Sequence, residues 1–377
     1  MPELYHLEDP MTHDPIPYLG TRLFKIPVNK ENVIKSGILD AKYADQIPEY
    51  IALRIPENKQ VLSKPELFLL DFLSHYEWDR PLSLLSKGGD LNIGIKDYLM
   101  YDGFSYRFVP LRHPLGRVDN GNVDPYDLYD KVMNVYTWDS FSREDYYVDY
   151  HHLYTFCGVL PQRRIFVETA NALLSVDEPL KALEVLDKCQ KSVPETQYPL
   201  DISLLEFSNE YMVVSLIESY YMVAEAIQAH AAEIEHADSR IEYARKQASG
   251  LAQRFALQNL ENVTMSCAGV LRSESELVDA EDYALRKAAN QRRVQADPDA
   301  YLAGLYEASR DPKKINRFTT PELQFLLAME RYGAAQDKLD ASKVYLEHLV
   351  GMTKTYGDEE LSDSLDGQLK TVLKVLE

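Results

Sequence analysis

The pattern of apolar and polar positions changes along the chain, from short mixed elements at the start to long helical periodicity after residue 162. Alternation over Leu23–Val28 predicts a strand, and the apolar run Tyr50–Ile55 predicts an extended segment. Helical spacing predicts short helices from Lys30 and over Asp40–Ala44. The first part of the chain is therefore expected to form short strands and helices.

The next helix has a clear start signal. Ser63 precedes Glu66 by three residues and Pro65 lies in the first turn, which is typical of a capping box. The positions that follow at helical spacing are Leu67, Leu70, Asp71 and Ser74. We expect this helix to end near Tyr76.

The segment after this helix alternates between strand-like and helix-like patterns. The expected elements are, in order, a short buried strand over 80–86, a turn at Gly88 and Gly89, a helix over 92–103 stopped by Gly103, and a strand over 104–111. Together with the earlier elements they predict a small mixed α/β layer.

The segment 165–194 has the spacing of a tetratricopeptide unit, with small residues where two antiparallel helices approach closely. The positions that fit are Phe166, Ala170 and Leu173 in the first helix and Ala182, Leu186 and Cys189 in the second, which Pro194 ends. A further apolar stripe at three- and four-residue steps runs through Phe207, Tyr211, Val214, Ile217, Tyr221 and Ala224.

These patterns predict an α+β chain, in which a small mixed α/β layer precedes an all-α tetratricopeptide-like helical array. A length of 377 residues exceeds the usual size of one hydrophobic core, so more than one unit is expected. We expect a small α/β domain over 1–120, an acidic, tyrosine-rich connector over 121–161 and a helical domain over 162–377.

Charge and hydropathy argue against nucleic acid and membranes as direct partners of this chain. With 60 acidic and 40 basic residues, the formal net charge is −20, which repels nucleic acid and anionic lipid headgroups. No segment has the run of about 20 apolar residues that a membrane span needs, and the start of the chain lacks the pattern of a secretory signal. We expect no nucleic-acid partner and no direct membrane insertion by this chain.

Motifs for metals, nucleotides and redox chemistry are incomplete. Cys157, Cys189 and Cys267 form no C-x-x-C pair and are expected to be buried thiols. His151 and His152 are adjacent and cannot face one ligand from a helix. The run "LLSKGGDLNIG" lacks phosphate-loop spacing, and "DNGNVDPYDLYD" lacks the ordered ligands of a calcium loop. We predict no cofactor and no metal site.

One polar cluster is the best candidate for a binding site. It combines Trp78, Asp79 and Arg80 with polar residues of the following strands, and 26 tyrosines in the chain are consistent with sugar- or protein-binding surfaces. The predicted ligand-binding residues are Trp78, Arg80, Lys96, Asp102, Tyr106 and Arg117. A structural ion pair at the end of a sheet, including Arg107, is the alternative interpretation.

Four segments between Tyr50 and Pro194 carry a family resemblance. They are "KPELFLLDFLSHYEWDRPLSLL", "IKDYLMYDGFSYRFVPL", "GRVD" and "RRIFVETANALLSVDEPLKALEVLDKC". In them the chain resembles the soluble C-terminal part of the "domain of unknown function 2723" family. These are multi-spanning bacterial membrane proteins that look like GT-C glycosyltransferases and have relatives among eukaryotic protein O-mannosyltransferases. This chain has Tyr76 where the N-x-W-x-R-P pattern of the family often carries asparagine.

The resemblance implies an accessory role on the periplasmic side of the bacterial inner membrane. In GT-C enzymes the catalytic carboxylate lies in an early loop beside the membrane, so the resemblance assigns no catalytic residue to this chain. The implied partners are an acceptor protein, a glycan or the membrane portion of the same protein. Two alternatives stay open: a carbohydrate-active enzyme using Asp124, Asp127 or Asp139, and a purely structural scaffold.

Overall fold

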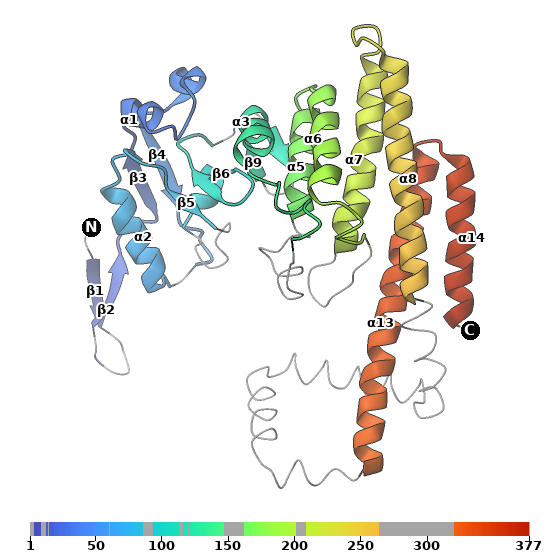
Figure 1. The fold of residues 1–377 in the computed structure, drawn as a ribbon. Helices are drawn as coiled ribbons and strands as arrows, with labels where there is room; N and C mark the ends of the chain where they lie inside the picture. The colour runs from blue at the N-terminus through green and yellow to red at the C-terminus, as the bar shows by residue number, and fades with distance from the viewer. Residues whose placement is uncertain are drawn as a thin grey trace. The chain divides into compact units, whose positions relative to one another are not determined.

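The fold has a sheet-containing N-terminal part followed by a helical region, as the sequence predicts (Figure 1). The computed structural model describes residues 4–8, 13, 15–59, 61–85, 93–112, 116–118, 121–146, 162–200, 209–263 and 320–376. The predicted turn at Gly88 and Gly89, His151, His152, Cys157 and Cys267 lie outside the described residues.

The chain divides into two compact units, which we call the sheet unit and the helix unit. The sheet unit comprises Met1–Asp149, Cys157–Pro194 and Met222–Ile241; the helix unit comprises Tyr150–Phe156, Glu195–Tyr221 and Glu242–Glu377. The first helical pair after residue 162 therefore belongs to the same compact unit as the sheets.

The described strands form three sheets. Two are antiparallel pairs, β1 with β2 and β3 with β4, and the third has five strands in the order β5-β7-β6-β9-β8, antiparallel except for the parallel pair β6–β9. The strand bounds are β1 Leu4–Glu8, β2 Pro15–Leu19, β3 Leu23–Pro27, β4 Tyr50–Arg54, β5 Ser83–Leu84, β6 Leu99–Tyr101, β7 Tyr106–Phe108, β8 Gly116–Val118 and β9 Gly121–Val123. The predicted strand at Leu23–Val28 and the extended run at Tyr50–Ile55 are confirmed, because they pair with each other as β3 and β4.

The helices range from single turns in the sheet unit to long rods in the helix unit. Their bounds are α1 Lys30–Lys35, η1 Ala41–Gln46, α2 Lys64–Ser74, η2 Ile95–Tyr98, α3 Pro125–Asp130, η3 Lys131–Val135, α5 Arg163–Leu174, α6 Pro179–Ser192, α7 Asn209–Ala229, α8 Ala237–Val263, α13 Thr320–Thr355 and α14 Glu359–Leu376. None of the helices within the described residues is long and apolar enough to cross a membrane.

The capping box of α2 is confirmed. Glu66 accepts from the Ser63 backbone N–H at 2.8 Å, and Lys59 pairs with the buried Glu66 carboxylate at 2.8 Å. The buried apolar positions of the helix are Leu70 and Leu73, so the buried face differs in part from the predicted one. The local capping signal determines where the helix begins, whereas packing determines which of its faces is buried.

The predicted helix over 92–103 is wrong. A single 3-10 turn ends at Tyr98, and the chain then enters β6, whose three residues are all buried between β7 and β9. A short apolar run suits a buried helix or a buried strand, and here the neighbouring strands decide. Gly103, at φ +96, lies in the β6–β7 turn and caps no helix.

The same region contains a glycine that the backbone requires. At Gly94, with φ +82, an added Cβ would lie 2.5 Å from the Arg54 carbonyl oxygen, so only glycine allows this close approach. The predicted strand over 80–86 is shortened to β5, and it is not buried, since Leu85 beside it is 82% exposed.

The sequence reasoning missed two short strands, one just before the predicted connector and one at its start. The β8–β9 hairpin completes the five-stranded sheet, and α3 follows with Asp124 as its N-cap. The π-helical turn η3 continues α3 directly. This segment therefore belongs to the packed sheet unit.

The helical pair predicted at 165–194 is confirmed as α5 and α6, which lie side by side (Figure 1). All six positions predicted to face the contact are at most 1% exposed: Phe166, Ala170, Leu173, Ala182, Leu186 and Cys189. The Cys189 thiol is buried as predicted, and burial raises its pKa to about 12.

Long helices form the core of the helix unit. Of the predicted stripe on α7, Val214, Ile217 and Tyr221 are buried in this unit, and Ala224 is buried in the part of α7 that belongs to the sheet unit. Phe207 and the side chain of Tyr211 lie outside the described residues. The Tyr221 ring stacks on Tyr356 at 4.8 Å, and its hydroxyl donates to Asp358 at 3.0 Å. This contact ties α7 to the turn before α14.

Candidate functional site

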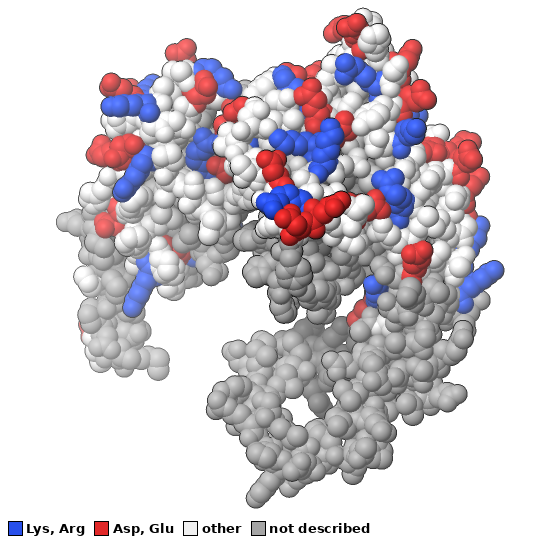
Figure 2. Space-filling model, in the orientation of Figure 1, with Lys and Arg blue, Asp and Glu red and all other residues white. Residues whose placement is uncertain are grey.

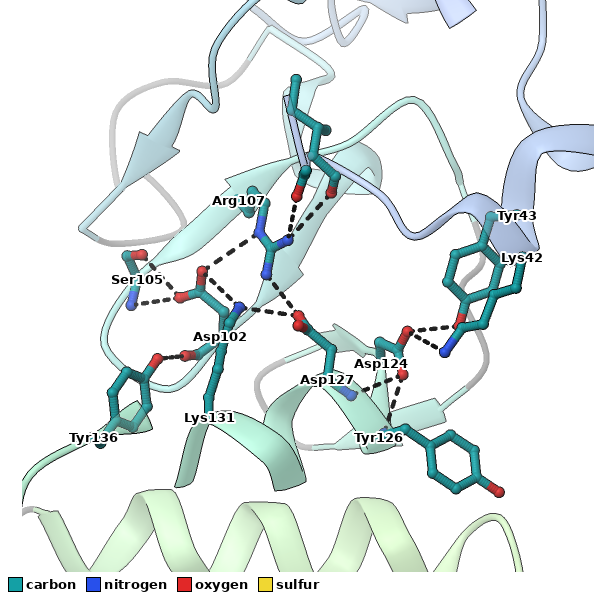
Figure 3. A network of polar contacts seen from close by, with 12 residues as sticks. Lys42, Tyr43, Asp102, Ser105, Arg107, Asp124, Tyr126, Asp127, Lys131 and Tyr136 are labelled. Carbon is teal, nitrogen blue, oxygen red and sulfur yellow. Dashed lines mark hydrogen bonds and ion pairs between the residues drawn. The ribbon is translucent and has the colours of Figure 1, made fainter. Parts of the chain in front are cut away.

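A partly buried ion network links β7, the β6–β7 turn and α3 (Figure 3), with the Asp127 side chain 36% exposed. The Arg107 side chain is only 9% exposed, and its Nη2 lies 2.6 Å from Asp127 Oδ2 while its Nε lies 3.6 Å from Asp102 Oδ2. Its Nη1 donates to the carbonyl oxygens of Gly37 and Ile38 at 3.3 and 3.2 Å. One guanidinium group therefore joins the β6–β7 turn to α3 and to the segment after α1.

A second cation closes this network. Lys131 Nζ lies 2.9 Å from Asp127 Oδ2 and 3.6 Å from Asp102 Oδ2. The other Asp102 oxygen accepts from the Ser105 hydroxyl at 2.9 Å, and the Asp102 carbonyl accepts from the Tyr136 hydroxyl. Two cations thus balance two carboxylates, which is the condition for tolerating buried charge.

Asp124 is also used to hold the fold. Its Oδ1 caps α3 by accepting from the backbone N–H groups of Tyr126 and Asp127 at 3.0 and 3.2 Å. Its Oδ2 accepts from the Tyr43 hydroxyl at 2.6 Å and pairs with Lys42 at 3.2 Å. Both oxygens of this buried carboxylate are occupied, which joins α3 to η1.

The electrostatics of the network favour permanently charged groups. Burial alone would raise the pKa of Asp127, but the Arg107 and Lys131 charges outweigh it and hold the pKa below its ordinary value. The pKa of Tyr43 is raised by burial and by its hydrogen bond to Asp124. Such groups keep one protonation state near neutral pH, so they are suited to stabilising the fold and not to transferring protons.

The lowered pKa of Asp127 predicts a pH dependence of stability. The ionised form is favoured in the folded protein, so its stabilisation is present above the unfolded pKa of about 3.9 and is lost as the pH falls through the lower folded value. We expect the stability difference between wild type and Asp127→Asn to shrink as the pH falls from 6 to 3, as measured by urea unfolding at each pH. The exposed Asp139→Asn is the matched control, and parallel curves for wild type and Asp127→Asn would contradict the prediction.

Trp78 lies in an aromatic cluster of the sheet unit and is fully buried. Its ring stacks on Phe108 at 5.1 Å and meets the Tyr76 ring at a tilt, 4.8 Å between ring centres, and its Nε1–H donates to the Pro27 carbonyl at 2.8 Å. Its φ of +58 is unusual for a bulky residue. The Trp78 side chain therefore belongs to the core.

A surface hollow of about 390 Å³ lies between the second half of α2 and the loop that follows it. Three aromatic side chains line it, Phe68, Phe72 and Tyr76. The other lining residues are polar or ionisable: Asp71, His75, Glu77, Asp79 and Arg80. The Tyr76 ring also contacts Trp78, so the aromatic cluster supports this hollow. Aromatic and charged side chains gathered around a concavity are typical of a binding site.

The six predicted ligand-binding residues occupy different environments. Arg80 lines the hollow, Trp78 lies in the core beside it, and Asp102 belongs to the buried ion network. Tyr106 is 9% exposed with its ring against Tyr101 at 5.5 Å, and Lys96 is exposed on η2. The Arg117 backbone pairs with Asn122 in the β8–β9 hairpin, and its side chain lies outside the described residues.

Sequence reasoning missed most of the hollow. Phe68 is 73% exposed, whereas Leu70 and Leu73 of the same helix are buried. An aromatic residue off the buried face of an amphipathic helix is a signal that could have been found. The ion pair between Arg107 and Asp127 spans 20 residues without any local pattern, so it had no such signal.

Acidic and basic side chains are interspersed on the face that Figure 2 shows. Among the exposed pairs are Arg112 with Asp97 at 3.1 Å and Arg143 with Asp145 at 2.6 Å. Such exposed pairs contribute little to stability. Local charge on this face is mixed, even though the chain as a whole is strongly acidic.

Comparison with known proteins places one similarity on the N-terminal part. Residues 5–127 match the family model described as TMEM260-associated domain 2, which is less than half of the 377-residue chain. No curated protein and no solved structure matches the chain. The matched range includes the whole hollow and Arg107, whereas Lys131 lies beyond it.

Proposed function

We propose that this chain is a non-catalytic accessory part of a longer, membrane glycosyltransferase-like protein, working on the periplasmic side of a bacterial inner membrane. Its role is to bind an acceptor protein, a glycan or the membrane portion of its own chain. Support comes from the motif resemblance and from the similarity of residues 5–127 to a domain named for its association with TMEM260.

The observation that carries the proposal is that the residues of the resemblance motifs maintain the fold. Trp78 packs in the core, and Asp102 and Arg107 hold buried ion pairs. These motif residues therefore stabilise the sheet unit. The exposed polar side chains next to them surround the hollow. A domain of this kind is suited to recognition rather than to bond cleavage.

The two helices α5 and α6 are proposed as the tetratricopeptide-like unit of this accessory part. Ala170, Ala182 and Cys189 are buried small residues, which allow close approach of the two helix axes. Stacked helical pairs commonly present a surface to a protein partner.

The alternative of a carbohydrate-active enzyme has less support. A general acid needs a carboxyl group with a raised pKa, and Asp127 has a lowered one. Asp124 is buried, with both oxygens engaged by Tyr43, Lys42 and the start of α3. Asp139 is exposed, so the three residues do not share one environment.

A turnover assay tests the accessory role. The purified chain is incubated with lipid-linked and nucleotide-activated sugars and with peptide acceptors, and in parallel applied to arrays of glycans and unfolded peptides. We expect no transfer and no hydrolysis, but selective binding on the arrays. Turnover that is lost in Asp124→Asn or Asp127→Asn, with the circular dichroism spectrum unchanged, would replace the accessory role by the enzymatic one.

A further inference from the structure

We infer that the hollow beside α2 binds a sugar ring of a neutral glycan, with Phe68 as the stacking surface and Asp79 and Arg80 as hydrogen-bonding groups. This inference rests on the proposed function and specifies the ligand class and the residues. Three features of the described residues support it: the exposed ring of Phe68, polar side chains without hydrogen-bond partners, and a loop whose backbone is held by hydrogen bonds.

The exposed ring is that of Phe68. It is 73% exposed on α2 and lines the hollow, while Phe72 and Tyr76 line the same hollow and stack at 5.7 Å. Sugar rings present apolar C–H faces that pack on aromatic side chains, and such packing removes apolar surface of both partners from water. The hollow therefore offers an apolar platform at its rim.

The polar groups of the loop are available to a ligand. Within the described part of the chain, the side chains of Glu77, Asp79 and Arg80 form no hydrogen bond or ion pair. They contrast with Asp102, Asp124 and Arg107, whose polar atoms are occupied.

The loop that carries these groups is held by its backbone. The Glu77 carbonyl accepts from Asn32 Nδ2 at 2.8 Å, the Trp78 carbonyl accepts from the Ser36 hydroxyl at 3.2 Å, and the Arg80 carbonyl accepts from the Tyr76 hydroxyl at 2.5 Å. Three of the four carbonyls from Glu77 to Arg80 are thus held by side chains of the sheet unit, while the side chains of Glu77, Asp79 and Arg80 stay exposed. A pre-organised loop lowers the entropic cost of binding.

The backbone at Trp78 adds to this argument. A bulky residue at φ +58 is strained and persists only where surrounding contacts impose this conformation. Here those contacts are the Pro27 hydrogen bond and the Phe108 stack. The strained turn places Asp79 and Arg80 after the buried tryptophan, at the edge of the hollow.

The mixture of groups selects a hydroxyl-rich, uncharged ligand. A hydroxyl both donates and accepts, so it is matched by carboxylate acceptors beside a guanidinium donor. The carboxylates Asp71, Glu77 and Asp79 and a net charge of −20 oppose anionic ligands. A basic peptide would pair with the carboxylates but would leave the Arg80 guanidinium without an acceptor, whereas hydroxyl groups can use both kinds of side chain.

The test is calorimetric titration of the purified chain with neutral trisaccharides of several hexoses and N-acetylhexosamines, beside a uronic acid oligomer and oligolysine. The variants are Phe68→Ala, Asp79→Asn and Arg80→Gln, all at exposed positions. Leu257→Ala, at a 51% exposed apolar position of the helix unit, is the matched control. We expect Phe68→Ala to weaken trisaccharide binding by about tenfold or more, the effect of truncating an anchoring ring, and the control to leave it unchanged.

The outcomes separate this inference from the proposed function. Trisaccharide binding that all three variants retain would overturn the inference and leave the accessory role standing. Binding of oligolysine or the uronic acid oligomer in place of trisaccharides, lost in Phe68→Ala, would replace the sugar by a charged ligand and overturn it as well. Absence of binding to any of these probes and to the arrays would overturn the inference and leave only the membrane portion as a partner.

Discussion

Replacing Trp78 with alanine is expected to destabilise the sheet unit by about 3–5 kcal/mol, the usual loss for truncating a buried large aromatic side chain. Trp78 is fully buried; it stacks on Phe108 and contacts the tilted ring of Tyr76. Alanine would leave a cavity beside Phe108 and Tyr76, and the Pro27 carbonyl would lose its donor. Urea unfolding followed by the fluorescence of Trp138, the other tryptophan of the chain, measures the effect.

Two further variants make this prediction specific. Trp78→Phe keeps an aromatic ring but loses the hydrogen bond to Pro27, and we expect a loss of about 1–3 kcal/mol. Leu85→Ala, at an 82% exposed position of the same unit, should change stability by less than about 0.5 kcal/mol. If Trp78→Ala were no more destabilising than Leu85→Ala, the core position of the tryptophan would be refuted.

Replacing Arg107 with alanine is expected to destabilise the sheet unit by about 1.5–3 kcal/mol, the usual contribution of hydrogen bonds to a charged group. The change leaves Asp102 and Asp127 with Lys131 as their shared cation, and the Gly37 and Ile38 carbonyls lose a donor. The loss is measured as the shift of the urea midpoint at pH 7.

An exposed pair provides the control for Arg107. Arg112 and Asp97 are joined at 3.1 Å with side chains 56% and 57% exposed, so Arg112→Ala should cost less than about 1 kcal/mol. Arg107→Lys keeps the charge but loses the planar fork, and an intermediate loss is expected. Equal effects of Arg107→Ala and Arg112→Ala would show that the buried network does not stabilise the fold.

Both predictions concern the motifs that carry the family resemblance. The tryptophan of "WDRP" and the arginine of "SYRF" are each surrounded by contacts within the sheet unit. A change at either position would therefore reduce binding through unfolding, not through loss of a ligand contact. Phe68, Asp79 and Arg80 are the positions where function can be tested with the fold intact.

Elements with local signals could be predicted from the sequence. Ser63 and Glu66 start α2, alternation places β3, and the helical spacing of Ala170 and Ala182 places α5 and α6. These signals depend on backbone hydrogen bonding and periodicity within a few residues. A mixed α/β part followed by helices was predicted on the same basis.

Elements decided by pairing could not be predicted in the same way. Residues 99–101 are a strand because β7 and β9 lie on either side, although their apolar run also suits a helix. The β8–β9 hairpin was missed for a similar reason, since its three-residue strands carry little pattern. The candidate site was predicted only in part, because Arg80 lines the hollow while Trp78 is buried beside it.

By itself, the sequence determined that a mixed α/β part precedes a helical region, that α2 begins with a capping box and that the α5–α6 contact is buried, because those properties depend on neighbours within a few residues. Only the tertiary structure decided that Arg107 reaches Asp127 and that Phe68 faces the hollow. Contacts between distant segments depend on how the elements pack, and the residues that form them follow no periodic pattern in the sequence.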